Sequence, residues 1–350
     1  MKKSLLATTA LAALGAVAVS SPASAKFEMK VGGFMEQWFG YSDNSNTAQP
    51  DSDTMEQHSD TEIHFKASQT LDNGLKVGAT VEMEGETGTI DEQYMTLDGS
   101  FGRIIIGSEN TAGYLMHYAV KSNGIGVEEG DGAGAWIAGA TGDLSRSNLH
   151  TAISSDDNNV TYFSPRINGI QIGASYIPET NDNDARTPVV GGLEENGERD
   201  NAFSVAANYV NSFDAMSFKV AVGYTEGGTD LNAAGSEEAL TAGVQLGFGG
   251  FTAAFAYGEH DRDDAAAVAN VNTFGASLAY NAGPAGVSLA YLRGEDSPAD
   301  DKQDQLELGA SYAVGPGITA AGSLYYIERV TAGTTAADGV AVAAGLKLAF

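Results

Sequence analysis

Apolar and polar residues alternate along this chain with a period of two, most clearly over its last twelve residues, GVAVAAGLKLAF (339–350). Every second residue from Val340 to Phe350 is apolar, whereas those between them are small or polar. Successive side chains of a β-strand point to opposite faces, so this stretch predicts a strand with one apolar and one polar face. A soluble β-sandwich could contain such a strand, but a terminal aromatic residue is typical of a strand that closes a membrane barrel.

The same alternation recurs in sixteen runs, separated by tight turns or by longer acidic stretches. The runs cover residues 26–41, 60–71, 74–86, 91–98, 102–108, 158–164, 167–178, 200–210, 213–226, 237–248, 250–259, 270–281, 285–294, 303–314, 317–328 and 339–350. Short connections, such as LDNG (71–74), alternate with longer ones, such as 42–59, 109–157 and 329–338. Transmembrane β-barrels have an even strand number, short turns at one end and long loops at the other. The pattern predicts an all-β, 16-stranded antiparallel transmembrane β-barrel with both chain ends at the short-turn rim.

Side-chain chemistry supports the barrel. Aromatic residues recur six positions apart in the apolar rows, as in Phe251 and Tyr257 or Phe274 and Tyr280, a spacing of about 20 Å along a strand. Two aromatic girdles flank the apolar band of membrane barrels. The polar rows between residues 60 and 86 carry charges, which predicts a water-filled lumen, and sixteen strands are enough to leave a channel.

The first 25 residues combine a basic start, an apolar core and an Ala-Ser-Ala site, and predict a secretory signal peptide followed by a barrel domain over 26–350. Removing the two lysines of residues 1–25 takes the formal net charge from −28 to −30. This sign argues against binding of nucleic acid through a basic patch. The chain has no cysteine, so disulfides do not stabilise it.

Several segments together resemble the sixteen-stranded general-diffusion porins of Gram-negative outer membranes, most closely the alphaproteobacterial type. They are FEMKVGG near the start, FGRIIIGS (101–108) before a long third loop, NNVTYFSPRINGIQIGASY (158–176) after it, and the terminal Phe. The resemblance implies a homotrimer in which the third loop folds into the barrel and narrows it. The Pro-Glu-Phe-Gly-Gly sequence of the enterobacterial branch is absent from this loop.

The third loop, about 109–157, is too long for a passive hairpin connection. Its acids outnumber its two basic residues, Lys121 and Arg146, and are Glu109, Glu128, Glu129, Asp131, Asp143, Asp156 and Asp157. We expect a constriction loop with an acidic face. Four inward-phase residues of the early strands predict an opposing basic wall: Lys30, Lys66, Lys76 and Arg103. A field between such rows favours polar over apolar solutes.

The sequence therefore predicts an outer-membrane porin, not an enzyme, that passes small hydrophilic solutes and ions with a weak cation preference. The alternatives are a substrate-specific channel, for which inward Phe34 and Trp38 are the only hints, an outer-membrane hydrolase using His64, or a structural adhesin. Expected partners are outer-membrane lipid and lipopolysaccharide, two further copies of the chain, and the barrel-assembly machinery. The machinery would read a terminal signal that contains Gly345, Leu348 and Phe350.

No pair of histidines has the spacing of a zinc site. Acidic residues in two outer loops offer oxygen ligands that suit calcium, although a solvated rim explains them equally well. They are Asp261, Asp263, Asp264, Asp296, Asp300 and Asp301. No cofactor is otherwise expected.

Overall fold

The computed structural model describes residues 27–46, 52–128, 133–137, 143–180, 200–227, 235–264 and 268–350. The predicted signal peptide lies outside these residues. Sixteen strands are present: β1 (Glu28–Asn46), β2 (Ser52–Thr70), β3 (Lys76–Glu84), β4 (Ile90–Gly99), β5 (Gly102–Ser108), β6 (Asn158–Phe163), β7 (Ile170–Glu179), β8 (Asp200–Phe213), β9 (Met216–Gly227), β10 (Gly235–Phe248), β11 (Phe251–Asp264), β12 (Val268–Ala282), β13 (Ala285–Ser297), β14 (Asp301–Gly315), β15 (Ile318–Thr331) and β16 (Thr334–Ala349).

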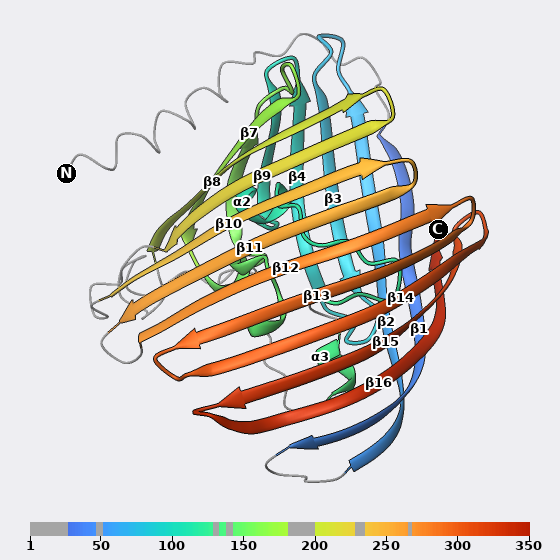
Figure 1. Ribbon diagram of the computed structural model, residues 1–350. Helices are drawn as coiled ribbons and strands as arrows, with labels where there is room; N and C mark the ends of the chain where they lie inside the picture. The colour runs from blue at the N-terminus through green and yellow to red at the C-terminus, as the bar shows by residue number, and fades with distance from the viewer. Residues whose placement is uncertain are drawn as a thin grey trace.

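The strands form one closed antiparallel barrel in which each strand pairs with its sequence neighbours and β1 pairs with β16 (Figure 1). The seam continues to the last residue, because Gly33 and Phe350 exchange backbone N–H···O bonds of 3.0 and 3.1 Å. Closure leaves no strand edge without a partner, as a sheet in lipid requires. The predicted fold class is confirmed.

The period of two sorts side chains between the two faces of the barrel wall. In β14, Gln303, Gln305 and Glu307 are buried on the lumen side, whereas Leu306 and Leu308 are exposed on the outer face. The exposed apolar row suits contact with the lipid hydrocarbon, and the polar row suits contact with water and with the loop inside the lumen.

Several strands extend further toward the long-loop end than the sequence pattern predicts. The stretch 329–338 was expected to be a loop, but β15 continues to Thr331 and β16 begins at Thr334. The turn consists of Ala332 and Gly333, both with positive φ (47° and 76°), as in the tight turns that join antiparallel strands. Beyond the apolar band both faces of a strand meet water, so the alternation that marks a strand in the sequence disappears there.

The aromatic residues expected in girdles pair across neighbouring strands. The rings of Phe251 and Tyr280 lie 4.4 Å apart between their centroids, and those of Phe274 and Tyr291 lie 5.9 Å apart. Residues directly or diagonally opposite on antiparallel strands are close enough for such contacts.

The described parts of the long connection between β5 and β6 lie inside the barrel and contain the helices of the described chain. These are α2 (Ala112–Leu115), α3 (Ala133–Trp136) and two 3-10 helices, η1 (Asp143–Ser145) and η2 (Leu149–Ala152). Among the described residues, no helix is long and apolar enough to cross a membrane. The short helix α2 contacts β7, β8 and β9, whereas α3 contacts β1 and β15 (Figure 1). The predicted inward-folded third loop is therefore present, and its path can be followed along the inner wall.

Candidate channel and its inner loop

Lumen-facing serines hold the first half of the loop against the wall. The Oγ atom of Ser175 on β7 accepts the N–H of Ala112 at 2.7 Å, and Ser204 on β8 accepts the N–H of Gly113 at 2.9 Å. Both N–H groups lie in the first turn of α2, where an α-helix has no internal acceptor for them. The wall thus supplies the acceptors that this short helix lacks.

Serine side chains also accept loop N–H groups further around the barrel. The N–H groups of Lys121, Asn123 and Ile125 donate to three further serine Oγ atoms at 2.7–2.8 Å. The three serines, Ser277 on β12, Ser288 on β13 and Ser323 on β15, all face the lumen. This segment therefore lies along the inner wall, bonded to β12, β13 and β15 through the N–H groups of alternate residues. We call the five serines the serine ladder.

Glycine in the wall allows the loop to come this close. Each strand from β9 to β14 has at least one inward glycine, and this set includes Gly223, Gly243, Gly258, Gly275, Gly294 and Gly309. A Cβ atom added at Gly309 would lie 2.5 Å from the backbone nitrogen of Gly124, and one at Gly275 would lie 2.7 Å from Cγ1 of Val120. Any side chain at these two positions would push the loop into the channel.

A buried histidine fixes the returning part of the loop. The imidazole of His150 is fully buried between Thr225 Oγ1, 2.7 Å from Nδ1, and Thr241 Oγ1, 2.8 Å from Nε2. Burial lowers the pKa of His150 to about 3, and burial likewise lowers the pKa of His117 to about 4. Both rings are therefore neutral at pH 7 and hold the loop without charge.

The tryptophan that hinted at a solute-binding aromatic row is instead part of the loop's support. Trp38 is only 2% exposed and packs in one cluster with Trp136 of α3, Tyr325 and Ile327. Its indole N–H donates to Glu36 at 3.1 Å. Because α3 covers Trp38, this tryptophan does not line the open lumen. It therefore gives no support for a substrate-specific channel.

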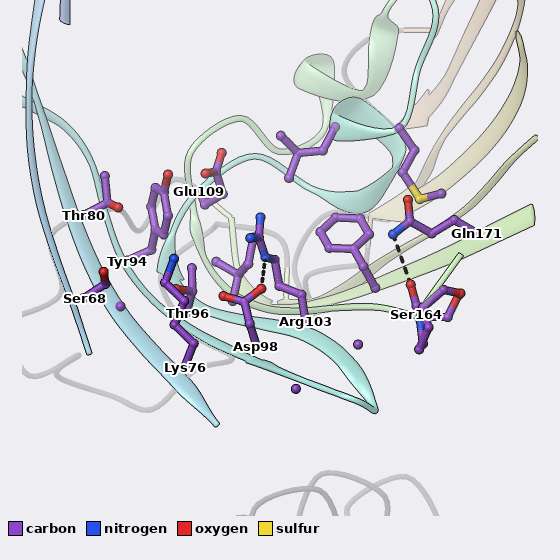
Figure 2. Close-up of a pocket in the computed structure, with 18 of the residues that line it drawn as sticks. Ser68, Lys76, Thr80, Tyr94, Thr96, Asp98, Arg103, Glu109, Ser164 and Gln171 are labelled. Carbon is purple, nitrogen blue, oxygen red and sulfur yellow. Dashed lines mark hydrogen bonds and ion pairs between the residues drawn. The ribbon is translucent and has the colours of Figure 1, made fainter. Parts of the chain in front are cut away.

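With the loop against β7–β15, the open lumen lies beside the early strands. A cavity of about 950 Å³ is lined by all four residues of the predicted basic wall, Lys30, Lys66, Lys76 and Arg103, and also by Arg166. In Figure 2, Lys76, Asp98 and Arg103 gather at one side of this space, and Arg103 Nε lies 2.5 Å from Asp98 Oδ1. Arg166 was missed because its turn, SPRING, reads only as a short connection in the sequence.

The acids predicted to line the loop have different roles. Glu109 lines the cavity, but its side chain is mostly buried, and this burial raises the pKa of its carboxyl group. Glu128 bends back toward its own loop, where its carboxylate accepts bonds from the N–H and Oγ of Ser147 at 3.1 and 2.8 Å. Glu129 and Asp131 lie outside the described residues, and Asp143 begins η1, with its side chain not described. Among the described residues of this set, Glu109 is the acid that lines the cavity, and a constriction formed by an acidic face of the loop stays a prediction.

A larger group of carboxylates lies on the early strands themselves. It comprises Asp60, Glu62, Glu82, Glu84, Asp91 and Glu92, and Asp156 joins it from the end of the loop. The imidazole of His64 contacts two of these acids, with Nε2 2.7 Å from Glu62 and 3.2 Å from Glu82. We call these seven residues the acidic cluster. The inward positions of residues 60–86 include Glu62, Glu82 and Glu84, so the sequence placed these acids in the lumen. It did not reveal the β2–β3 register that brings them together.

The residues of the predicted terminal signal lie at the seam of the barrel. Leu348 pairs with Met35 of β1 and Ile318 of β15 on the outer face, and Phe350 is 65% exposed. Gly345 lies against Trp38 and the carbonyl oxygen of Gln37. Their role in assembly stays a prediction.

The acids proposed for calcium are partly engaged with cations. Asp300 pairs with Lys302 at 2.9 Å, and Asp301 pairs with Arg329 and accepts a bond from Thr331 at 2.7 Å. The side chains of Asp263 and Asp264 are outside the description, and both Asp261 and Asp296 have interactions of their own.

A closed sixteen-stranded barrel with an apolar outer face, a polar lumen and an internal loop defines a channel protein of outer membranes. A family model described as Gram-negative porin matches residues 7–332, and the chain belongs to this family. It is thus a β-barrel porin of the Gram-negative outer membrane. The family consists of channels without enzymatic activity, so the hydrolase reading of His64 is dropped.

Solved structures support the fold at low sequence identity. An anion-selective porin from Comamonas acidovorans is 15% identical, with a TM-score of 0.66 over 93% of this chain and 100% of that one. The trimer form of OmpT from Vibrio cholerae is 13% identical, with a TM-score of 0.60 over 93% and 99%. A porin refined at 1.8 Å is 20% identical, with a TM-score of 0.62 over 92% and 100%. A search of curated protein sequences gives no significant match.

Proposed function

We propose that this porin passes small hydrophilic solutes and ions by passive diffusion, with a weak cation preference. The observation that carries the preference is the acidic cluster on β2–β4, which crowds carboxylates onto one side of the open lumen. In a water-filled pore the attraction of the wall carboxylates for cations is weakened by the high dielectric constant of water and is screened by salt over ~10 Å at 0.1 M. The preference is therefore modest and grows as the salt concentration falls.

The basic wall favours a second candidate, a pore that prefers anions. Lys30, Lys66, Lys76, Arg103 and Arg166 all line the cavity, and the Comamonas acidovorans relative is titled anion-selective. The two candidates differ in the sign of one measurement, the reversal potential of a single channel across a KCl gradient.

For the cation-preferring pore, we expect the dilute side to become positive for the wild-type channel. Glu62→Gln with Glu84→Gln should reduce the potential without closing the pore. Glu295→Gln is the matched control, because Glu295 is exposed and pairs with Arg293 outside the lumen. A potential of the opposite sign would establish the anion-preferring alternative, and a double variant equal to wild type would remove the acidic cluster from the argument.

We also propose that the protein is a homotrimer of the alphaproteobacterial type, in contact with lipopolysaccharide and inserted by the barrel-assembly machinery. The trimer form of the Vibrio cholerae relative supports this stoichiometry. Multi-angle light scattering of the detergent-extracted protein tests it, and a monomer mass would reject it. Calcium at the acidic outer loops stays a prediction, which equilibrium dialysis with radioactive calcium would test.

A further inference from the structure

The fixed charge of the lumen changes sign along the channel axis. On β2 the successive inward residues from the short-turn end are Lys66, His64, Glu62 and Asp60, so two carboxylates follow the cation. On neighbouring β3, Lys76 lies at the short-turn end, whereas Glu82 and Glu84 lie toward the long-loop end. The register places His64 opposite Glu82 and Glu62 opposite Glu84, so both strands change sign at the same height.

The short-turn half of the lumen carries cations from strands all around the barrel. They are Lys30 on β1, Lys66 on β2, Lys76 on β3, Arg103 on β5, Arg166 in the β6–β7 turn, Lys219 on β9 and Lys347 on β16. Four of them contact carboxylates, namely Lys30 with Glu28, Lys66 with Glu82, Arg103 with Asp98 and Lys347 with Glu36.

In the described part of the chain, no carboxylate pairs with Lys76, Arg166 or Lys219. Lys219 Nζ lies over the ring of Tyr118, 5.5 Å from its centroid, and Arg166 donates to Gly169 O and Gln171 Oε1. This half therefore keeps an excess of positive charge.

The long-loop half next to these strands keeps the opposite excess. The acidic cluster fills it from β2, β3 and β4 and, through Asp156, from the end of the inner loop, and Glu109 adds a carboxyl group at the start of that loop. The two halves meet where Lys66 Nζ lies 3.9 Å from Glu82 Oε1.

We propose that this axial step of charge makes the porin a rectifier, which conducts ions better in one direction of the applied voltage than in the other. Cations accumulate beside the carboxylates and anions accumulate beside the lysines and arginines. When the long-loop side is positive, both kinds of ion enter through the half that attracts them and accumulate where the halves meet, so conductance rises. The reverse voltage draws both away from this junction and depletes it.

The proposal rests on the proposed channel function, and it is tested by the current at equal and opposite voltages through single channels of the full porin. The orientation of each channel is determined with Asp300→Cys, whose thiol reacts with a reagent added on the long-loop side. The reaction is read without background because the chain has no other cysteine. At 0.1 M salt, where the screening length is ~10 Å, we expect the current to be roughly twofold larger with the long-loop side positive. The ratio should approach one at 1 M salt, where screening shortens to ~3 Å.

Two variants show which charges produce the effect. Lys76→Gln, Arg166→Gln and Lys219→Gln together remove cations that no carboxylate partners, so the ratio should fall toward one while the channel stays open and its cation preference increases. Lys302→Gln removes a cation on the outward-facing row of β14, outside the lumen, and should leave the ratio unchanged.

Equal currents in the wild type at low salt, a larger current with the long-loop side negative, or an undiminished ratio in the triple variant would each overturn the proposal while leaving the porin function intact. A folded protein that gives no conductance would overturn both.

Discussion

Lys66 and Glu82 face the lumen from neighbouring strands, with Nζ 3.9 Å from Oε1, and the fixed charge of the wall changes sign between them. The contact joins a half-exposed ammonium group to a carboxylate that His64 and Tyr94 also contact. Exposed ion pairs contribute little to stability, so this pair matters for the field in the channel more than for the fold.

The serine ladder should decide whether the inner loop stays against the wall. Replacing Ser288 and Ser323 by Ala removes two acceptors for the loop's N–H groups, at about 1 kcal/mol each. We expect cleavage within residues 109–157 by an added protease to become about tenfold or more faster, with larger fluctuations of single-channel current. Ser311→Ala is the matched control, because Ser311 lies on β14 near the short-turn end and makes no side-chain bond to the loop. Equal cleavage of the double variant and the control would refute a clamping role.

Acid should loosen the same loop through His150. Its folded pKa of about 3 lies below the unfolded value of ~6.5, so the unfolded state binds more protons between these values. The anchoring is fully present above pH 6.5 and weakens as the pH falls, by up to ~1.4 kcal/mol per pH unit. Hydrogen exchange of residues 109–125 should therefore speed up from pH 7 to pH 4, after correction for intrinsic rates. His150→Gln, which cannot gain a proton, should show a smaller change, and an identical pH profile in the two proteins would be contrary evidence.

Single cysteines should report which end of the barrel faces outward. The chain contains no native cysteine, so each introduced thiol is read without background. Asp300→Cys, between β13 and β14, should react with an impermeant thiol reagent on intact cells, whereas Asn73→Cys, between β2 and β3, should react only after lysis. Both positions are exposed, so a difference in labelling reports the side of the membrane on which each position lies. Labelling of both on intact cells would contradict the orientation.

Removing the terminal aromatic ring should impair assembly. Phe350→Ala keeps the backbone bonds with Gly33 but loses the ring of the predicted assembly signal. We expect several-fold less outer-membrane trimer and more protease-sensitive periplasmic monomer, measured by fractionation and unheated gel electrophoresis. Phe248→Ala, another exposed aromatic at a strand end, serves as the control. A normal yield from Phe350→Ala would argue against the signal.

The barrel and the basic wall could be predicted because the period of two fixes which face each residue occupies. Lys66 and Lys76 share an inward phase and both lie near one short turn, so they had to meet at one end. The strand extensions to Thr331 and from Thr334 could not be predicted, since a strand with water on both sides has no alternation to detect.

The path of the loop was also beyond the sequence. Ser288 and Gly309 are unremarkable residues for any lumen, and their meaning depends on which part of the loop lies opposite. The bond between Glu128 and Ser147 could not be predicted for the same reason, because nothing in the sequence shows that Ser147 returns to this part of the loop.

The serine ladder holds the loop through its backbone N–H groups, which every residue except proline supplies. Of the three residues that donate these N–H groups, Lys121 has an exposed side chain, whereas Asn123 also donates to the carbonyl oxygen of Val287 and Ile125 packs against the cluster around Trp38. A mutation at Lys121 can therefore change what the channel admits without disturbing how the loop is attached. The backbone atoms of this segment attach the loop, whereas the side chain of Lys121 faces the pore. This position is therefore one where selection, or a protein engineer, can alter permeability without altering the architecture.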